Sequence, residues 1–185
     1  MIAAGHAGLS APGFVLVAFD GANCDRIRKS LGCRIPFPSL LRFLVPGGEP
    51  VRAVYHRDLR DRTEAKRLDG LLRHLERKGF EVHGAGPDDM GNGPRERYGT
   101  NLVELAVAVM GFADEARRVV LVGGDRKLVP LAQALRERGT HLTVATALSV
   151  PEVIRASPEL LDEANEVVDF TAHVLAAADG EKRND

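Results

Sequence analysis

Two short apolar runs, each ending in an aspartate, constrain the fold of this chain most. Phe14–Phe19 leads directly into Asp20, and Val119–Val122 leads through two glycines into Asp125. Apolar runs of this length, bounded by glycine, are typical of strands buried on both faces of a parallel sheet. Ligands of open parallel sheets bind beyond the carboxyl ends of the strands. The sequence therefore predicts that both carboxylates lie at one edge of a parallel sheet, where they suit a hard divalent cation such as Mg²⁺.

The rest of the chain alternates between strand and helix patterns. Strands are predicted at 14–19, 51–56, 80–83, 118–122, 141–146 and 166–170, and helices at 24–31, 38–44, 62–78, 101–112, 128–138 and 158–164. This alternation predicts an α/β protein with a three-layer, Rossmann-like fold, in which helices cover both faces of a central, mainly parallel sheet. The helix at 101–112 is apolar nearly all round, which predicts that it is buried.

No internal repeat or linker divides the chain, which predicts one domain over residues 14–175. A Gly- and Ala-rich lead-in, 1–13, is expected to be disordered, and residues 176–185 are expected to form a flexible tail. No apolar stretch approaches the ~20 residues that a membrane span needs, and the lead-in lacks the features of a signal peptide. Cys24 and Cys33 have no metal-ligand spacing. We therefore expect a cytoplasmic protein with free thiols and no membrane partner.

Several motifs, taken in chain order, resemble those of the NYN domain, a branch of the PIN-like metal-dependent ribonucleases. They are Asp20-Gly-Ala-Asn23, Gly99-Thr-Asn-Leu102, Gly123-Gly-Asp125 with Val129-Pro-Leu131, Gly139-Thr-His-Leu-Thr-Val144, and Ser157-Pro-Glu-Leu-Leu161 with Ala164-Asn-Glu-Val-Val-Asp169. The resemblance covers roughly residues 14–170. It implies a PIN-like fold and a metal-dependent endoribonuclease that acts on RNA, here single-stranded, through aspartates at strand ends.

The resemblance also implies roles for particular residues. Asp20 would be the central metal ligand, Asp125 its partner, and Asn23 would orient a ligand water or contact a phosphate. We expect one Mg²⁺ or Mn²⁺ rather than two, because Mg²⁺ keeps several waters and needs only one or two carboxylates, so two aspartates can hold one ion. Glu104 lies one helical turn after Asn101, so it either supplies a third catalytic carboxylate or forms a surface ion pair.

The chain departs from the family pattern at three positions that usually carry aspartate: Asn101, Lys127 and Asn165. Two hypotheses therefore stand. One is an active ribonuclease with a reduced acidic site, and the other is a degenerate member that binds RNA or a protein partner without cleavage and without a metal. A small-molecule phosphohydrolase with Asp20 as nucleophile is disfavoured, because the expected second acid is replaced by Ala22.

Basic residues near these motifs are candidates for contact with RNA. Lys127 would either lower metal affinity or grip a phosphate, and Arg126 adds to a basic lip. The long Gly- and Pro-rich loop at 84–99 carries Arg95 and Arg97 for phosphates and Tyr98 for stacking on a base. Asn101 is a further candidate for substrate contact.

Two surface features have open interpretations. One face of the helix at 62–78 carries Arg62, Lys66, Arg73 and Arg77, and either follows a phosphate backbone or is a solvated face with interleaved acids. Phe37, Leu40, Leu41 and Phe43 crowd one segment and form either core or a surface for a homo-oligomer. The histidines show no metal spacing and are expected to be structural.

Overall fold

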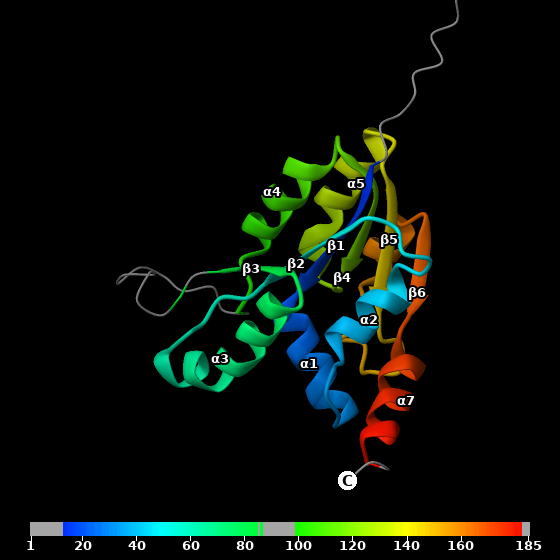
Figure 1. Cartoon of the computed structure of the whole chain (residues 1–185). Helices are drawn as coiled ribbons and strands as arrows, with labels where there is room; N and C mark the ends of the chain where they lie inside the picture. The colour runs from blue at the N-terminus through cyan, green and yellow to red at the C-terminus, as the bar shows by residue number, and fades with distance from the viewer. Residues whose placement is uncertain (1–12, 85, 87–98, 183–185) are drawn as a thin grey trace, which may run out of the picture.

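A computed structural model describes residues 13–84, 86 and 99–182. Its centre is a six-stranded sheet, parallel throughout, with the strand order β3-β2-β1-β4-β5-β6 (Figure 1). The strands are β1 Phe14–Asp20, β2 Val51–His56, β3 Phe80–His83, β4 Ala116–Val122, β5 His141–Thr146 and β6 Glu166–Asp169. This arrangement confirms the predicted α/β class.

Helices cover both faces of the sheet and complete the three layers. They are α1 Gly21–Leu31, α2 Phe37–Leu44, α3 Arg62–Arg77, α4 Leu102–Phe112, α5 Val129–Glu137, α6 Pro158–Asp162 and α7 Thr171–Lys182, with a 3-10 turn, η1, at Arg126–Leu128. One core cluster packs α1, α2, α3 and α7 against the sheet, and the other packs α4, α5 and α6 against its opposite face.

The central strand shows why the apolar runs lack alternation. Val15, Val17 and Phe19 belong to the first core cluster, whereas Leu16 and Ala18 belong to the second. All five side chains are fully buried, because each face of the strand meets a helical layer. A strand of this kind must be apolar at every position.

The strand order reverses between β1 and β4, which makes this the switch point of the sheet. The chain proceeds from β1 outward through β2 and β3, and then returns to add β4 on the other side of β1. Phe19 pairs with Val122, so Asp20 and the Gly-Gly-Asp125 turn leave the sheet at the same level. Crevices for ligands form at such switch points, outside the carboxyl ends of the strands.

Two expectations about helices were wrong. Residues 176–182, expected in a flexible tail, belong to α7, whose Ala-rich sequence favours helix and whose Val174 is fully buried in the core. Helix α4 is only half-buried: Leu105 and Val109 face the core, but Val103 and Val107 are 73% and 66% exposed. The helix is apolar all round although only one side of it meets the sheet.

Arg95, Arg97 and Tyr98 lie outside the described residues, as do most of the loop at 84–99 and residues 1–12 of the lead-in. Within the described ranges, the model contains no helix with the length and apolar character needed to cross a membrane.

Candidate functional site

Asp20 is a buried carboxylate at the end of the central strand. It is 2% exposed and caps the N-terminus of α1, where its Oδ1 accepts hydrogen bonds of 3.0 Å from the backbone N–H groups of Ala22 and Asn23. Burial raises the pKa of Asp20 above its usual value, although the hydrogen bond from Asn23 opposes this shift. A nearby positive charge would therefore stabilise the ionised carboxylate, because water contributes little there.

Thr100 fixes the turn that follows Asp20. Its Oγ1 accepts a hydrogen bond of 3.1 Å from the backbone N–H of Ala22, and its hydroxyl lies 3.3 Å from the carbonyl oxygen of His56, to which it donates. The residue is buried and connects the start of α4 to the ends of β1 and β2. Sequence reasoning missed this role, although Thr100 lies inside the Gly-Thr-Asn motif.

Asn23 holds one half of its side chain in place and leaves the other half without a partner. Its Nδ2 donates to the carbonyl oxygen of Ile154 at 2.8 Å, whereas its Oδ1 is buried and has no hydrogen-bond partner. A buried acceptor without a partner is uncommon in folded proteins and costs free energy. This oxygen is therefore suited to receive a donor or a cation from a ligand.

The glycines before Asp125 permit a close approach of three chain segments. A Cβ at Gly123 would lie 3.2 Å from the Cβ of Asp20, and one at Gly124 would lie 2.7 Å from the backbone of Ala156. Asp125 itself caps η1, and its Oδ1 accepts a hydrogen bond of 2.9 Å from the backbone N–H of Lys127. The turn thus places Asp125 between the end of β1 and the segment after β5.

A pocket of about 280 Å³ opens at this edge of the sheet. Asn23, Asp125 and Arg126 line it, whereas Asp20 does not, and Arg26 and Arg155 also line it. The two further arginines were missed. Their positions could have been inferred from the sequence. Arg26 follows Asn23 by nearly one helical turn, and Arg155 follows β5, which ends at this same edge of the sheet.

Asn101 and Glu104 engage each other at the start of α4. Asn101 caps the helix by accepting hydrogen bonds from the backbone N–H groups of Val103 at 3.1 Å and Glu104 at 3.3 Å. Its Nδ2 donates to Oε1 of Glu104 at 2.9 Å. This reciprocal arrangement resembles a capping box, which accounts for both side chains locally. The catalytic role of Glu104 stays a prediction.

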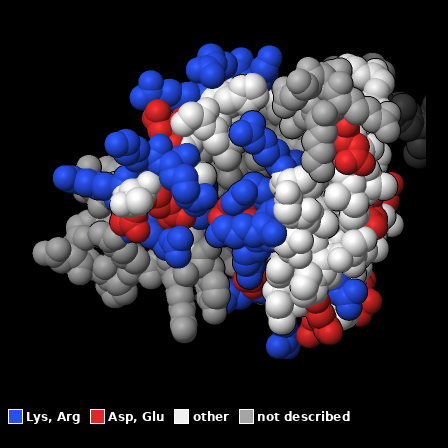
Figure 2. All heavy atoms as spheres, turned by 90° about the horizontal axis from the view of Figure 1, so that it is seen from below, with Lys and Arg blue, Asp and Glu red and all other residues white. Residues whose placement is uncertain are grey.

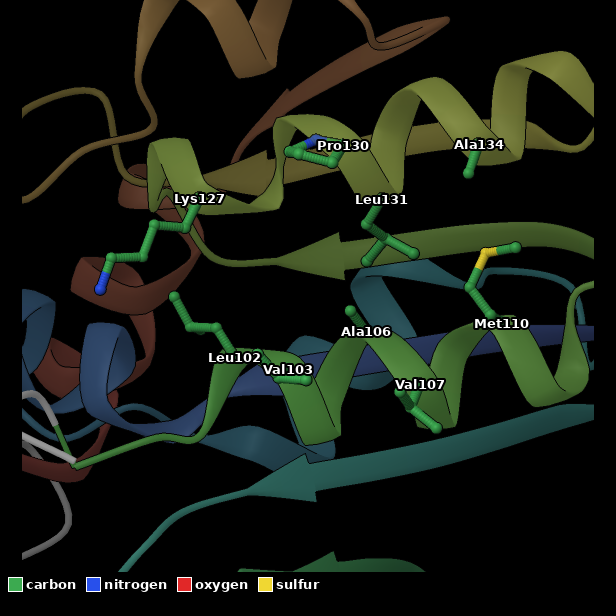
Figure 3. Close-up of a pocket in the computed structure, with 9 residues that line it drawn as sticks. All are labelled: Leu102, Val103, Ala106, Val107, Met110, Lys127, Pro130, Leu131 and Ala134. Atoms are coloured by element: carbon green, nitrogen blue, oxygen red, sulfur yellow. The ribbon is translucent and has the colours of Figure 1, made fainter. Parts of the chain in front are cut away.

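The other two departures from the family pattern, Lys127 and Asn165, are not among the residues that line this pocket. The side chain of Lys127 lines an apolar groove between α4 and α5 and extends toward Leu102 at the start of α4 (Figure 3). Asn165 accepts a hydrogen bond of 2.8 Å from the backbone N–H of Leu142, near the start of β5, so it lies at the opposite, amino end of the sheet. Its amide therefore has no bearing on the acidity of the pocket.

Two histidines continue the row of strand ends beside Asp20. His56 pairs in register with Asp20, and its ring stacks on that of His83 with centroids 5.0 Å apart. Burial, together with the neighbouring His83, lowers the pKa of His56 to about 4. Its imidazole is therefore neutral at pH 7, and its structural role stays a prediction.

The described part of the chain contains no group of three or more His, Cys, Asp or Glu side chains placed to hold a metal ion. Oxygen donors near the switch point include the carboxylates of Asp20 and Asp125 and the unpaired amide oxygen of Asn23, and the carboxylate of Glu152 belongs to a further residue that lines the pocket. Hard oxygen donors of this kind suit Mg²⁺ or Mn²⁺.

Comparison with known proteins gives a family and a fold. A family model described as the NYN domain matches residues 14–171. A solved structure of a protein of unknown function from Vibrio parahaemolyticus RIMD 2210633 superimposes with a TM-score of 0.66 at 18% identity, covering 86% of this chain and 93% of that chain. A search of curated proteins finds no significant match.

Proposed function

This chain belongs to the NYN domain family, a PIN-like family whose members are typically nucleases, and we propose that it is a metal-dependent endoribonuclease. One observation carries the proposal. Asp20 ends β1 and Asp125 follows β4 on either side of the switch point, and Asp125 lines a pocket that Arg26, Arg126 and Arg155 also line. Carboxylates for a cation and guanidiniums for phosphates are the groups that phosphodiester hydrolysis requires.

One Mg²⁺ or Mn²⁺ fits the donors at this edge, with Asp20 and Asp125 as charged ligands and the amide oxygen of Asn23 as a third donor. When bound, such an ion lowers the pKa of a bound water and offsets charge on a phosphate. The protein would hold these ligands in fixed positions. Two backbone N–H groups hold Asp20, and the carbonyl of Ile154 holds Asn23.

The arginines of the pocket would bind the RNA backbone. Arg26 and Arg155 line the pocket beside Asn23, and Arg126 lies 3.2 Å from a carboxylate oxygen of Glu159, which restrains it. Guanidinium–phosphate contacts fix the position of a strand without reading its sequence. Arg95, Arg97 and Tyr98 stay proposed contacts for a single strand.

A second candidate function, binding of RNA or a protein without cleavage, is favoured by the capping arrangement of Asn101 and Glu104. That arrangement engages Glu104, the side chain that could add a third carboxylate. If it persists with RNA bound, two carboxylates remain for the metal. This candidate predicts RNA binding that a chelator does not alter.

Cleavage of a fluorescent single-stranded RNA in Mg²⁺ or Mn²⁺ tests the proposal. We expect cleavage by the wild type and a loss of about 10²-fold or more in Asp20→Asn and Asp125→Asn, the scale seen when one electrostatic group is removed from an active site. Asp69→Asn is the matched control, because Asp69 is exposed on α3 and pairs with Arg73 at 2.9 Å. Undiminished cleavage in Asp20→Asn would show that the site is wrong.

Metal binding gives a readout besides activity. Mn²⁺ should raise the unfolding temperature of the wild type by mass action, and Asp125→Asn should lose this shift. RNA binding without cleavage and without a metal-dependent shift would support the second candidate instead.

A further inference from the structure

We propose that a single strand of RNA held at the pocket continues across α1 into a basic groove on α3. The groove has a volume of about 710 Å³ and lies between α3 and the connection from α1 to α2. We call it the α1–α3 groove, and Arg28, Arg34, Arg67 and Arg77 mark its rim. The inference rests on the proposed function and extends its substrate site.

The groove combines a charged rim with an apolar floor. Ile35, Leu68 and Leu71 supply apolar lining, and none of the described residues that line the groove is acidic. Single-stranded nucleic acid presents phosphates and base faces together, so it suits a concave surface of positive charge and apolar contact. Phe37 also lines the groove but is buried, so it offers little ring surface on which a base could stack.

The arginines of the rim fall into two pairs. Asp25 lies 3.0 Å from Arg28 and 3.9 Å from Arg67, which restrains these two guanidiniums at the groove. Arg34 and Arg77 make no ion pair with any carboxylate in the described part of the chain. The first pair is therefore held in place, and the second pair is available to an anion.

Helix α1 connects the pocket with the groove. Arg26 lines the pocket, Arg28 lines the groove, and Lys29, whose side chain is 58% exposed, lies between them around the helix. Asp25 is the only acid in α1. Figure 2 views the carboxyl end of the sheet and shows Lys and Arg side chains gathered over α1 and α3. Basic side chains thus extend from one site to the other, with Asp25 paired to Arg28 and Lys29 among them.

The outer face of α3 differs from the groove in charge pattern. There Arg73 pairs with Asp69 at 2.9 Å, as expected for a solvated face of mixed sign. Of the four basic residues considered on this helix from the sequence, Arg77 alone is among the lining residues of the groove. The groove thus differs from this outer face in having Arg34 and Arg77, which make no ion pair in the described part of the chain, among its lining residues.

Binding of two RNA lengths tests the proposal. In an Asp20→Asn background, which prevents cleavage, anisotropy would be measured with fluorescent oligouridylates of about 5 and about 20 nucleotides, lengths that bracket common single-strand site sizes. Arg34→Ala with Arg77→Ala should weaken binding of the longer RNA about tenfold and leave the shorter RNA unchanged. The slope of log K against log salt for the longer RNA should fall by about 1.4, or about 0.7 for each phosphate that an arginine no longer neutralises.

Two controls separate charge from folding. Arg73→Ala removes an arginine of the same helix outside the groove and should leave both affinities unchanged. Arg34→Lys with Arg77→Lys keeps the charge and should keep most of the salt slope. A weaker affinity in the alanine variant that the lysine variant restores therefore supports electrostatic binding.

The failure of this inference differs from the failure of the proposed function. Unchanged affinity for the longer RNA, with cleavage still dependent on Asp20, overturns the groove alone. An equal decrease in affinity for both RNA lengths also overturns it, since the arginines would then act at the pocket or on the fold. No RNA cleavage by the wild type and no RNA binding by any variant overturns both.

Discussion

Glu64→Gln should destabilise the protein by removing one charge from a buried ion-pair network. Glu64 is 4% exposed on α3. Its Oε1 lies 2.5 Å from Nη2 of Arg57, whose side chain is also 4% exposed, and its Oε2 accepts hydrogen bonds from Arg60 through the backbone N–H at 3.0 Å and through Nε at 3.1 Å. Glutamine keeps the shape of the side chain but leaves the charge of Arg57 uncompensated.

The size of the effect follows from the pKa of Glu64. Burial raises this pKa, but hydrogen bonds from Arg60 and Arg57 more than offset the rise and hold it at about 2, against an ordinary 4.5. At 1.36 kcal/mol per unit, this difference corresponds to about 3 kcal/mol. Water screens the pairs, because the side chains of Arg60 and Arg67 are 54% and 45% exposed, and reduces the value to about 2 kcal/mol.

The usual cost of breaking a buried ion pair gives a similar value for the loss of stability. Removing one partner of a buried ion pair costs about 3–5 kcal/mol, because it leaves a buried charge. Asp25 lies 3.9 Å from Nη2 of Arg57 and would compensate part of that charge. We therefore expect a loss of about 2–3 kcal/mol, which lowers the unfolding temperature by about 4–12 °C in a domain of this size.

Urea unfolding at several pH values measures this loss. In the unfolded chain Glu64 takes up a proton near pH 4.5, whereas in the native protein it does so near pH 2, so its stabilisation is complete above pH 4.5 and disappears as the pH falls to 2. The difference in free energy of unfolding between the wild type and Glu64→Gln should therefore disappear as the pH falls from 4.5 to 2. Glu81→Gln is the control and should cost less than about 1 kcal/mol, because Glu81 and its partner Arg52 are each 38% exposed. A gap that persists at pH 2, or a Glu64→Gln loss no larger than the control, would refute the reasoning.

Three further predictions concern stability. Gly124→Ala should lower the free energy of unfolding in urea by about 1–3 kcal/mol and impair cleavage, because its Cβ would lie 2.7 Å from the backbone of Ala156. Gly70→Ala has open space around it in α3 and should instead stabilise the protein by about 0.5–1 kcal/mol. Equal effects of the two alanines would contradict this account of the turn. Asn101→Ala should lower the free energy of unfolding by about 1 kcal/mol through loss of the α4 cap, and Asn101→Asp should restore it; a neutral alanine variant would exclude the cap. His56 has a pKa lowered to about 4 from 6.5, so protonation of the unfolded chain should reduce stability as the pH falls from 6.5 to 4, and His56→Gln should flatten that part of the profile; an unchanged profile would count against a buried neutral imidazole.

The fold could be predicted from the sequence because its signals are local. Phe14–Phe19 and Val119–Val122 are apolar at every position, as strands between two helical layers require, and Gly32, Gly79 and Gly139 end helices with a positive φ. The strand order required more than local pattern, since pairing of β1 with β4 joins segments about a hundred residues apart. Local patterns therefore predicted the strands but not their order in the sheet.

The site was predicted less fully, because distant segments complete it. The family model supports the motif-based family prediction, but the roles of Asp20, Asp125 and Glu104 stay predictions. The hydroxyl of Thr100 and the carbonyl of Ile154 hold Ala22 and Asn23, and neither contact follows from spacing. The direction of the Lys127 side chain depends on how η1 packs beside α4, which the sequence does not reveal.

The position of the switch point has a consequence for how the site comes into existence. β1 carries Asp20 and β4 delivers Asp125, so the two carboxylates meet only after the chain between them has folded and β4 has docked on the central strand. A fragment that ends at β3 would contain Asp20 but not Asp125, and the edge of β1 that pairs with β4 would be exposed. Long-range pairing of this kind forms slowly and closes a large loop. If Asp20 and Asp125 hold a metal ion as proposed, metal binding should first appear during refolding when the two halves of the sheet join.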